Sequence, residues 1–75
     1  MENSKKFLYN SRNLVVFLIP TIGSFRLEVW ENGHKVNTCE ITAPLHEINS
    51  DADTAMQWVV DEVIKGRIPL IPETP

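Results

Sequence analysis

The chain has 75 residues, a net charge of −3 and one cysteine. A chain of this length predicts a single small domain, 1–75, which buries only about 60% of the surface that its unfolded chain exposes, so a partner or a second copy would add stability. Seven scattered basic residues argue against nucleic-acid binding, and a lone cysteine excludes an internal disulfide.

Residues 1–11 are mostly polar and are expected to form a frayed lead-in to the domain. The run 14–19 is apolar at every position, is mostly β-branched or aromatic and is followed by Pro20, which predicts a strand. Both faces of this strand need burial, so we expect it in the centre of a sheet or at an oligomer interface. The run is far too short to cross a membrane, and we expect a cytoplasmic protein.

Residues 24–31 alternate between apolar and polar side chains, which predicts a half-buried strand. Asn32-Gly33 follows and is a strong hairpin signal, because both residues tolerate positive φ. The segment 34–42 is then the return strand. This hairpin would place Trp30 opposite Lys35, where a cation–π contact could account for the tryptophan.

The sequence does not decide which residues of the two hairpin strands pair with each other. A two-residue turn pairs Val29 with Val36, but it also sets Phe25 opposite Glu40. A β-bulge near residues 37–38, or a three-residue loop, would keep Glu40 out of the core. Both of these alternatives are slightly favoured over a regular two-residue hairpin.

A helix is predicted over 51–65. Ser50 is the expected N-cap, Asp53 completes a pattern like a capping box, and Gly66 ends the helix after Lys65. Apolar residues recur inside it at three- and four-residue spacing and form one stripe that can pack on a sheet. The expected fold is therefore α+β: a three-stranded antiparallel β-meander packed by one C-terminal α-helix, in the order β-β-β-α, with an extended proline-containing tail at 67–75.

One helix covers one face of a sheet, so another element must cover the second face. The candidates are the N-terminal segment, the tail or a second chain. Trp58 lies off the apolar stripe of the helix, and either an interface or intramolecular packing would explain it. The tail cannot be helical and could dock on its own sheet or on a partner. The predicted protein-binding residues are Trp58, Trp30, Ile68, Leu70 and Ile71.

No motif for catalysis, metal or cofactor binding is found. His46 and Glu47, near Asp51 and Asp53, match no zinc or calcium spacing, and we expect no metal. The three glycines stand apart, so a phosphate-binding loop is not expected, and neither is a cofactor or an enzyme. Cys39 is expected to be a small core hydrophobe rather than a nucleophile.

These observations favour a small non-catalytic protein-interaction module. It would act as a regulator, inhibitor or accessory subunit by binding a protein partner or a second copy of itself as a homodimer. Its size and acidity alone suggest a phage or mobile-element protein. The sequence does not name the partner.

The alternative is a nucleic-acid-binding domain that uses the free face of the three-stranded sheet. Over about residues 14–65, the β-β-β-α order resembles plant-type and integrase-arm DNA-binding domains in topology, without a shared motif. It is similar in the same way to the partial ribonuclease-H-like fold of small antitoxins. The first resemblance implies a free sheet face with basic and aromatic residues, which here would be Arg26, Trp30 and Lys35, together with the acidic Glu28.

Overall fold

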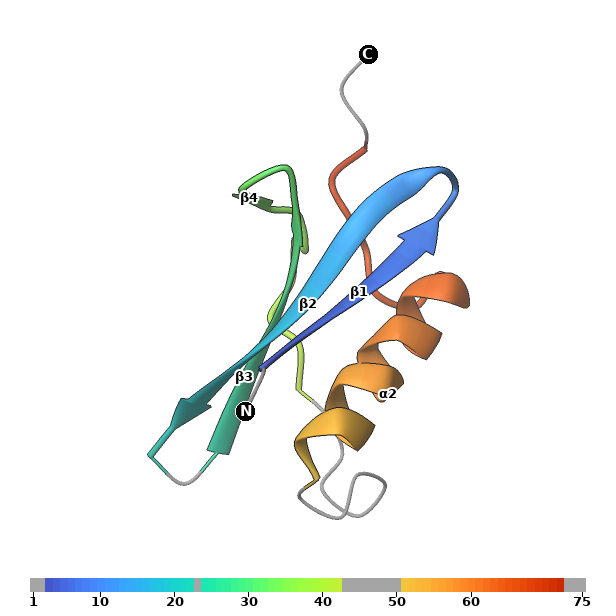
Figure 1. The fold of residues 1–75 in the computed structure, drawn as a ribbon. Coiled ribbons are helices and arrows are strands. Elements are labelled where there is room, and N and C mark those ends of the chain that lie inside the picture. Colours follow the sequence, from blue (N-terminus) through green and yellow to red (C-terminus); the bar gives the residue numbers. More distant parts are fainter. Residues whose placement is uncertain (1–2, 23, 43–50, 73–75) are drawn as a thin grey trace.

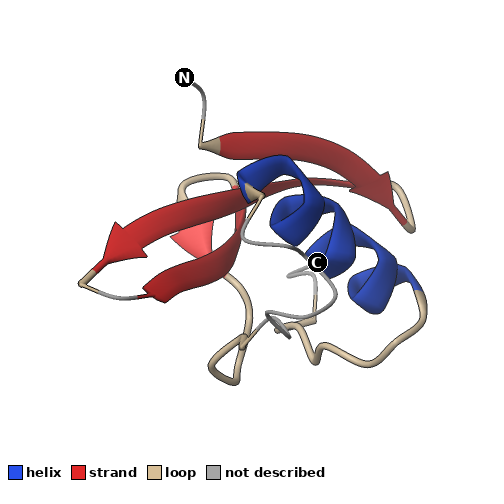
Figure 2. Ribbon diagram, turned by 90° about the horizontal axis from the view of Figure 1, so that it is seen from below, coloured by secondary structure: helices blue, strands red, loops and turns tan. Residues whose placement is uncertain are grey.

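The fold is an antiparallel sheet of four strands with one helix packed on it (Figure 1). A computed structural model describes residues 3–22, 24–42 and 51–72. Along the chain the elements are β1 (Ser4–Tyr9), β2 (Arg12–Thr21), β3 (Ser24–Glu31), β4 (His34–Lys35) and α2 (Ala52–Ile64), and the strands lie side by side in that order. Viewed from below, α2 runs along one side of the sheet beside β1 and β2 (Figure 2). The expected α+β class is confirmed, with four strands instead of three.

Residues 4–9, which were expected to be a frayed lead-in, form the edge strand β1. This strand pairs with β2 along its whole length, with Phe7 opposite Leu14 and Tyr9 opposite Arg12. The connecting turn places both of its central residues at positive φ, 49° for Asn10 and 63° for Ser11, as a two-residue hairpin with the twist of the sheet requires. In the structure Lys5, Phe7 and Tyr9 are half-buried and alternate with the exposed Lys6 and Leu8. The sequence does not show this alternation, because Lys5 is charged and Leu8 is apolar.

Strand β2 is the central strand, as its apolar run predicts. Its inward residues Leu14, Val16 and Leu18 are buried, with Val16 opposite Val29 and Leu18 opposite Leu27 on β3. The core lies between this face of the sheet and α2. It consists of Leu14, Val16, Leu18, Leu27, Val29, Val36, Ile41, Ala55, Met56, Val59, Val60 and Val63.

The hairpin after β3 has a two-residue turn, so the three-residue loop is wrong. Asn32 and Gly33 have φ of 51° and 80°, and Val36 N donates to Val29 O at 2.8 Å. Regular pairing then stops after β4, and the rest of the expected strand 34–42 is irregular. The next paired residues are Leu27 and Ile41. In a regular ladder the partner of Leu27 would be residue 38, so the segment after β4 contains three more residues than regular pairing would need.

The Asn37 side chain replaces the backbone ladder that this irregular segment lacks. Its Oδ1 accepts a hydrogen bond from Val29 N at 3.0 Å, and its Nδ2 donates to Cys39 O at 2.9 Å. The extra residues loop outward, so that Glu40 is exposed and Ile41 lies in the core. The bulge alternative predicted these positions for Glu40 and Ile41. Cys39 is exposed, so the expectation of a core cysteine is wrong.

We expect Asn37→Ala to lower the free energy of unfolding by about 1–3 kcal/mol, because Val29 N would remain buried without a partner. Thr38→Ala is the matched control, since Thr38 is the exposed neighbour and its loss should cost much less. Urea unfolding of both variants measures the difference. Equal effects of the two substitutions would show that Asn37 does not stabilise the irregular segment.

The residue that caps the start of the helix is Asp51, whereas the predicted N-cap, Ser50, lies outside the described residues. Asp51 is the N-cap: its Oδ1 accepts from Asp53 N at 3.1 Å and its Oδ2 accepts from Thr54 Oγ1 at 3.0 Å. At the other end Lys65 is the C-cap, and Gly66 takes a φ of 77°, as expected for a helix stop. Among the residues described, no helix is long and apolar enough to cross a membrane.

Candidate functional site: the outer face of the sheet

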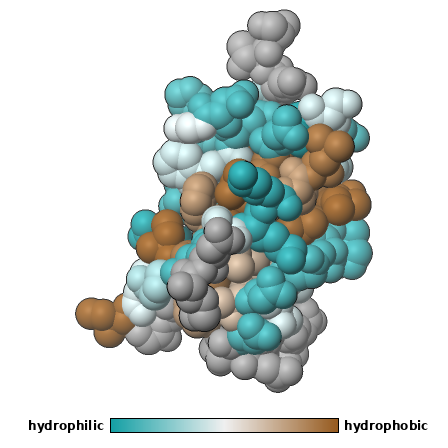
Figure 3. Space-filling view, in the orientation of Figure 1, coloured by the Kyte–Doolittle hydropathy of each residue, from teal (hydrophilic) through white to brown (hydrophobic). Residues whose placement is uncertain are grey.

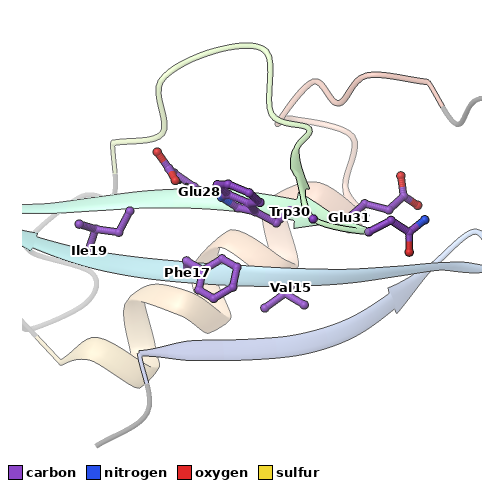
Figure 4. Close-up of a pocket in the computed structure, with 8 residues that line it drawn as sticks. Val15, Phe17, Ile19, Glu28, Trp30 and Glu31 are labelled. Atoms are coloured by element: carbon purple, nitrogen blue, oxygen red, sulfur yellow. Dashed lines mark hydrogen bonds between the residues drawn. The ribbon is translucent and has the colours of Figure 1, made fainter.

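The face of the sheet away from α2 carries a strip of apolar side chains, called here the outer face. Val15, Phe17 and Ile19 project from β2 and Trp30 projects from β3 on this side (Figure 4). They line a hollow of about 520 Å³ together with Glu28 and the Asn32-Gly33 turn. Phe17 and Ile19 keep 37% and 38% of their surface exposed, whereas their neighbours on the inner face are almost fully buried.

An aromatic pair lies in the middle of the outer face. The rings of Phe17 and Trp30 meet edge to face, with centroids 5.9 Å apart and planes at 86°. Trp30 Nε1 donates to Glu28 Oε1 at 3.0 Å. The indole is therefore held in a fixed orientation, with its polar atom satisfied and its ring available as a contact surface.

The predicted position of Trp30 opposite Lys35 is confirmed. The ammonium of Lys35, however, lies 4.0 Å from Glu28 Oε2, and the ring contact of Trp30 is with Phe17. Half of the Lys35 side chain is exposed, while only 12% of the Glu28 side chain is. This single long contact with a half-exposed lysine contributes little stability, and the other oxygen of the Glu28 carboxylate accepts the hydrogen bond from Trp30.

The charged side chains surround the apolar strip. Lys6 on β1 is in register with Val15, and Arg26 on β3 is in register with Ile19, so both lie on the outer side of the sheet. A second, more polar hollow of about 300 Å³ adjoins the strip and is lined by Arg26, Glu28, Lys35 and Glu40, among others. The apolar centre is thus bordered by Lys6 on the β1 side and by Arg26, Glu28, Lys35 and Glu40 on the other side.

Apolar side chains also reach the surface elsewhere. The space-filling view shows them projecting at the tip of the β2–β3 hairpin, at the lower left (Figure 3). Ile22 in this turn is fully exposed, and Ile64 on α2 is largely exposed. Leu8 is also largely exposed and lies on the outer side of β1, two residues after Lys6. The outer face differs from these isolated positions because its apolar side chains are contiguous and line a hollow.

Three of the predicted contact residues pack inside the domain. Trp58, Ile68 and Leu70 are half-buried against the core. This is the intramolecular alternative that the sequence left open for Trp58 and the tail. Ile71 remains 46% exposed, and of the predicted residues only Trp30 lies in the outer-face hollow. Sequence reasoning missed Phe17 and Ile19, although the uniformly apolar run 14–19 had indicated that the second face of β2 needs cover.

The tail docks as an extended segment on its own sheet. Leu70 bridges to Asn37, Ile71 N donates to Val36 O at 2.8 Å, and Thr38 N donates to Pro69 O at 3.2 Å. The tail thereby pairs with the irregular segment after β4, where the sheet would otherwise present an open edge. Its backbone is consequently less available for pairing with another chain.

A buried ion pair holds the end of this tail. Arg12 Nη2 donates to Glu31 Oε1 at 2.8 Å and Arg12 Nε donates to Glu31 Oε2 at 3.0 Å, while Nη2 also donates to Ile71 O at 2.8 Å. These hydrogen bonds and the charge of Arg12 lower the pKa of Glu31 from its ordinary value of 4.5, although burial opposes the shift. Because the pair clamps β2, β3 and the tail together, its role is structural.

The side chains that sequence analysis considered as metal ligands or nucleophiles are not brought together in the described part of the chain. Within residues 3–22, 24–42 and 51–72, no three His, Cys, Asp or Glu side chains come together in a way that could hold a metal ion. His46 and Glu47 lie outside this part of the chain, so the predicted absence of a metal stays a prediction. Cys39 and His34 are both exposed, Cys39 within the irregular segment and His34 on β4 before it.

A comparison with protein-family models finds no match to this chain, and comparisons with curated proteins and with solved structures find none either.

Proposed function

We propose that this protein is a small non-catalytic protein-interaction module that binds its partner through the outer face. It would act as a regulator, inhibitor or accessory subunit. The observation that carries the proposal is the uncovered apolar strip of Val15, Phe17, Ile19 and Trp30 with its hollow of about 520 Å³. Contiguous apolar surface with a polar rim is typical of protein-binding sites.

The arrangement of the strip supports a protein ligand. Binding energy at interfaces concentrates in a few aromatic side chains near the centre of the contact, surrounded by polar groups that exclude water. Phe17 and Trp30 occupy that central position, and their edge-to-face contact fixes them before binding. A pre-organised aromatic pair loses little side-chain entropy when a partner covers it.

Nucleic-acid binding is the alternative, and one observation favours it. Lys6, Arg26 and Lys35 flank the same face that carries the exposed Phe17 and the partly exposed Trp30, and single-stranded nucleic acids bind to such surfaces. Against it, Glu28 lies between these cations and Lys35 is directed to it. The fourth strand also removes the topological basis of the resemblance to three-stranded DNA-binding domains.

Affinity capture from a lysate of the source organism tests the proposal. We expect the wild-type chain to retain a stoichiometric protein, and Ile19→Ser to reduce its recovery at least about tenfold, since losing one buried aliphatic side chain costs roughly 1.5–3 kcal/mol. Ile64→Ser is the matched control, because Ile64 is an exposed isoleucine on the helix. Equal recovery with both variants would contradict the outer face as the binding site.

The purified wild-type chain also tests the alternative function, nucleic-acid binding. Binding of labelled single-stranded DNA or RNA that weakens steeply between low and moderate salt, and that Arg26→Glu abolishes, would replace the protein-binding proposal. Retention of the protein partner together with no salt-dependent nucleic-acid binding would support it.

A further inference from the structure

We infer that the open edge of β1 binds an extended segment of a partner protein, which adds a strand to the sheet and carries acidic and apolar side chains in alternation. The inference goes beyond the proposed function, because it concerns the edge of the sheet and not its outer face. Strand β1 is the first in the sheet order, and among the described strands only β2 pairs with it (Figure 4). An edge strand presents unpaired backbone groups, so it can accept another strand.

The strand register shows which backbone groups of β1 face away from the sheet. Asn3 O accepts a hydrogen bond from Leu18 N at 2.8 Å, so these two residues form a hydrogen-bonded pair. Such pairs alternate along an antiparallel ladder, so every second residue of β1, beginning with Lys5, directs its N–H and C=O groups to β2. The residues between them direct these groups to the open edge, and they are Ser4, Lys6 and Leu8.

Strand β1 has no proline or bulge that would close its edge. Its six residues pair with β2 in continuous register. The opposite side of the sheet differs, because the tail pairs with the irregular segment there, and Pro69 and Pro72 have no N–H to donate to a further strand. Of these two sides, β1 is therefore the one that can accept a strand of about six residues, roughly 20 Å long.

The lysines of β1 select the charge of the added strand. This strand carries Lys5 and Lys6 and no carboxylate. Lys5 is on the inner side, where its Nζ lies 3.4 Å from Asp53 Oδ1 on α2, whereas Lys6 is exposed on the outer side. A carboxylate opposite Lys6 would form a cross-strand pair of opposite charges, which stabilises a sheet, whereas a like charge there would destabilise it.

The same lysine disfavours a second copy of this chain at the edge. When two β1 strands pair antiparallel, residues that face the edge must lie opposite each other. The register that uses all of them sets Ser4 against Leu8 and Lys6 against Lys6. Two ammonium groups directly opposite each other are destabilising. We therefore assign the edge to a different, acidic chain.

The inner side of the edge selects apolar side chains. Phe7 and Tyr9 pack against the core at the rim of the sheet but are only half-buried. Successive side chains of a strand point to opposite faces, so an added strand that sets acidic residues beside Lys6 sets its other residues beside these two rings. Apolar residues there would bury more of the aromatic surface. The two sides of the edge together define a partner strand that alternates acidic and apolar residues.

A synthetic peptide of alternating glutamate and valine, about seven residues long with blocked ends, tests the inference on the full chain. Hydrogen–deuterium exchange followed by NMR reports each backbone amide separately. At a peptide concentration about ten times its Kd, we expect exchange at the amides of Ser4, Lys6 and Leu8 to slow about tenfold, since only the unbound chain exchanges. The amide of Phe7, which faces β2, should change little.

Two matched peptides separate backbone pairing from charge. The same peptide with N-methylated glutamates cannot donate hydrogen bonds to the edge when its glutamates lie opposite Lys6, and it should give no protection. The peptide with lysine in place of glutamate keeps the backbone but reverses the charge. It should bind at least about tenfold more weakly.

A substitution in the protein tests the assigned residue. Lys6→Glu changes an exposed side chain and should weaken binding of the glutamate peptide roughly tenfold, because it sets like charges opposite each other. Lys65→Glu is the matched control, since it makes the same change of charge at an exposed position at the end of α2, and it should bind like the wild type.

Absence of protection at these three amides at submillimolar peptide overturns the inference. Equal binding of the glutamate and lysine peptides, or of the Lys6→Glu and Lys65→Glu proteins, overturns the acidic partner. Protection that rises with protein concentration in the absence of peptide would assign the edge to a second copy instead. The lysate capture that compares Ile19→Ser with Ile64→Ser tests the outer face on its own, so a failure of one proposal is distinguishable from a failure of the other.

Discussion

Replacing Arg12 by methionine is expected to lower the free energy of unfolding by about 3–5 kcal/mol. Arg12 and Glu31 keep only 9% and 12% of their side-chain surface exposed, and two hydrogen bonds of 3.0 and 2.8 Å join them. Removing one partner leaves the other charge buried without compensation, which is among the most destabilising single changes in a small domain. The tail also loses the hydrogen bond from Arg12 to Ile71 O.

Arg67→Met is the control for this substitution. Arg67 also pairs with a glutamate, Glu62, but its side chain is 68% exposed and the atoms are 3.7 Å apart. The Glu62 side chain is only 12% exposed, as that of Glu31 is, but Arg67 is largely hydrated and makes one long ion pair instead of two short hydrogen bonds. Such a pair contributes about 1 kcal/mol or less, so the control should remain close to the wild type in urea unfolding. The double variant Arg12→Met/Glu31→Leu should recover most of the lost stability, because an apolar pair of similar volume needs no charge partner. An Arg12→Met protein as stable as the control would contradict a structural role for the pair.

The same pair predicts how stability depends on pH. The folded-state pKa of Glu31 lies below its ordinary value of 4.5, so its carboxylate is favoured by folding. Its contribution is therefore present above about pH 4.5 and is lost as the pH falls through the folded-state pKa. Unfolding measured across this acidic window should show a smaller loss of stability for Glu31→Gln than for the wild type. An equal loss in both proteins would show that other carboxylates dominate acid unfolding.

Leu14→Ala is expected to cost about 2–5 kcal/mol, comparable to much of the stability of the domain. Leu14 is 1% exposed, lies on the central strand opposite Phe7 and faces α2, so its truncation leaves a cavity between the sheet and the helix. A domain of this length has only about 4–11 kcal/mol of net stability, which makes partial unfolding at ambient temperature an expected result.

The matched control is Ile64→Ala, which removes the same number of carbon atoms from a helix position that is 55% exposed. Its effect on the free energy of unfolding should stay within about 0.5 kcal/mol, and alanine is also the better helix former. Thermal unfolding followed by circular dichroism measures both variants. Similar melting temperatures for the two would contradict the assignment of Leu14 to the core.

Much of the outer face follows from the sequence, but its identity as a site does not. The run 14–19 is apolar at every position, which requires cover on both sides of its strand. The sequence cannot say which side α2 covers, because the helix stripe fits either face. Once α2 lies against Leu14, Val16 and Leu18, the alternate residues Val15, Phe17 and Ile19 are left on the outer face.

Local patterns determined the elements whose signals lie within a few residues. The Asn32-Gly33 turn, the strand before it, the central position of β2 and the helix all depend on short-range backbone and periodicity preferences. They formed as predicted, except that the N-cap of the helix is Asp51 and not Ser50. Only the tertiary structure decided the rest. Strand β1 exists because β2 offers it a complete partner, and residues 37–40 leave the ladder because Asn37 replaces it. The tail stays on the sheet because Arg12 reaches Ile71 across 59 residues of chain, a contact that no local pattern encodes.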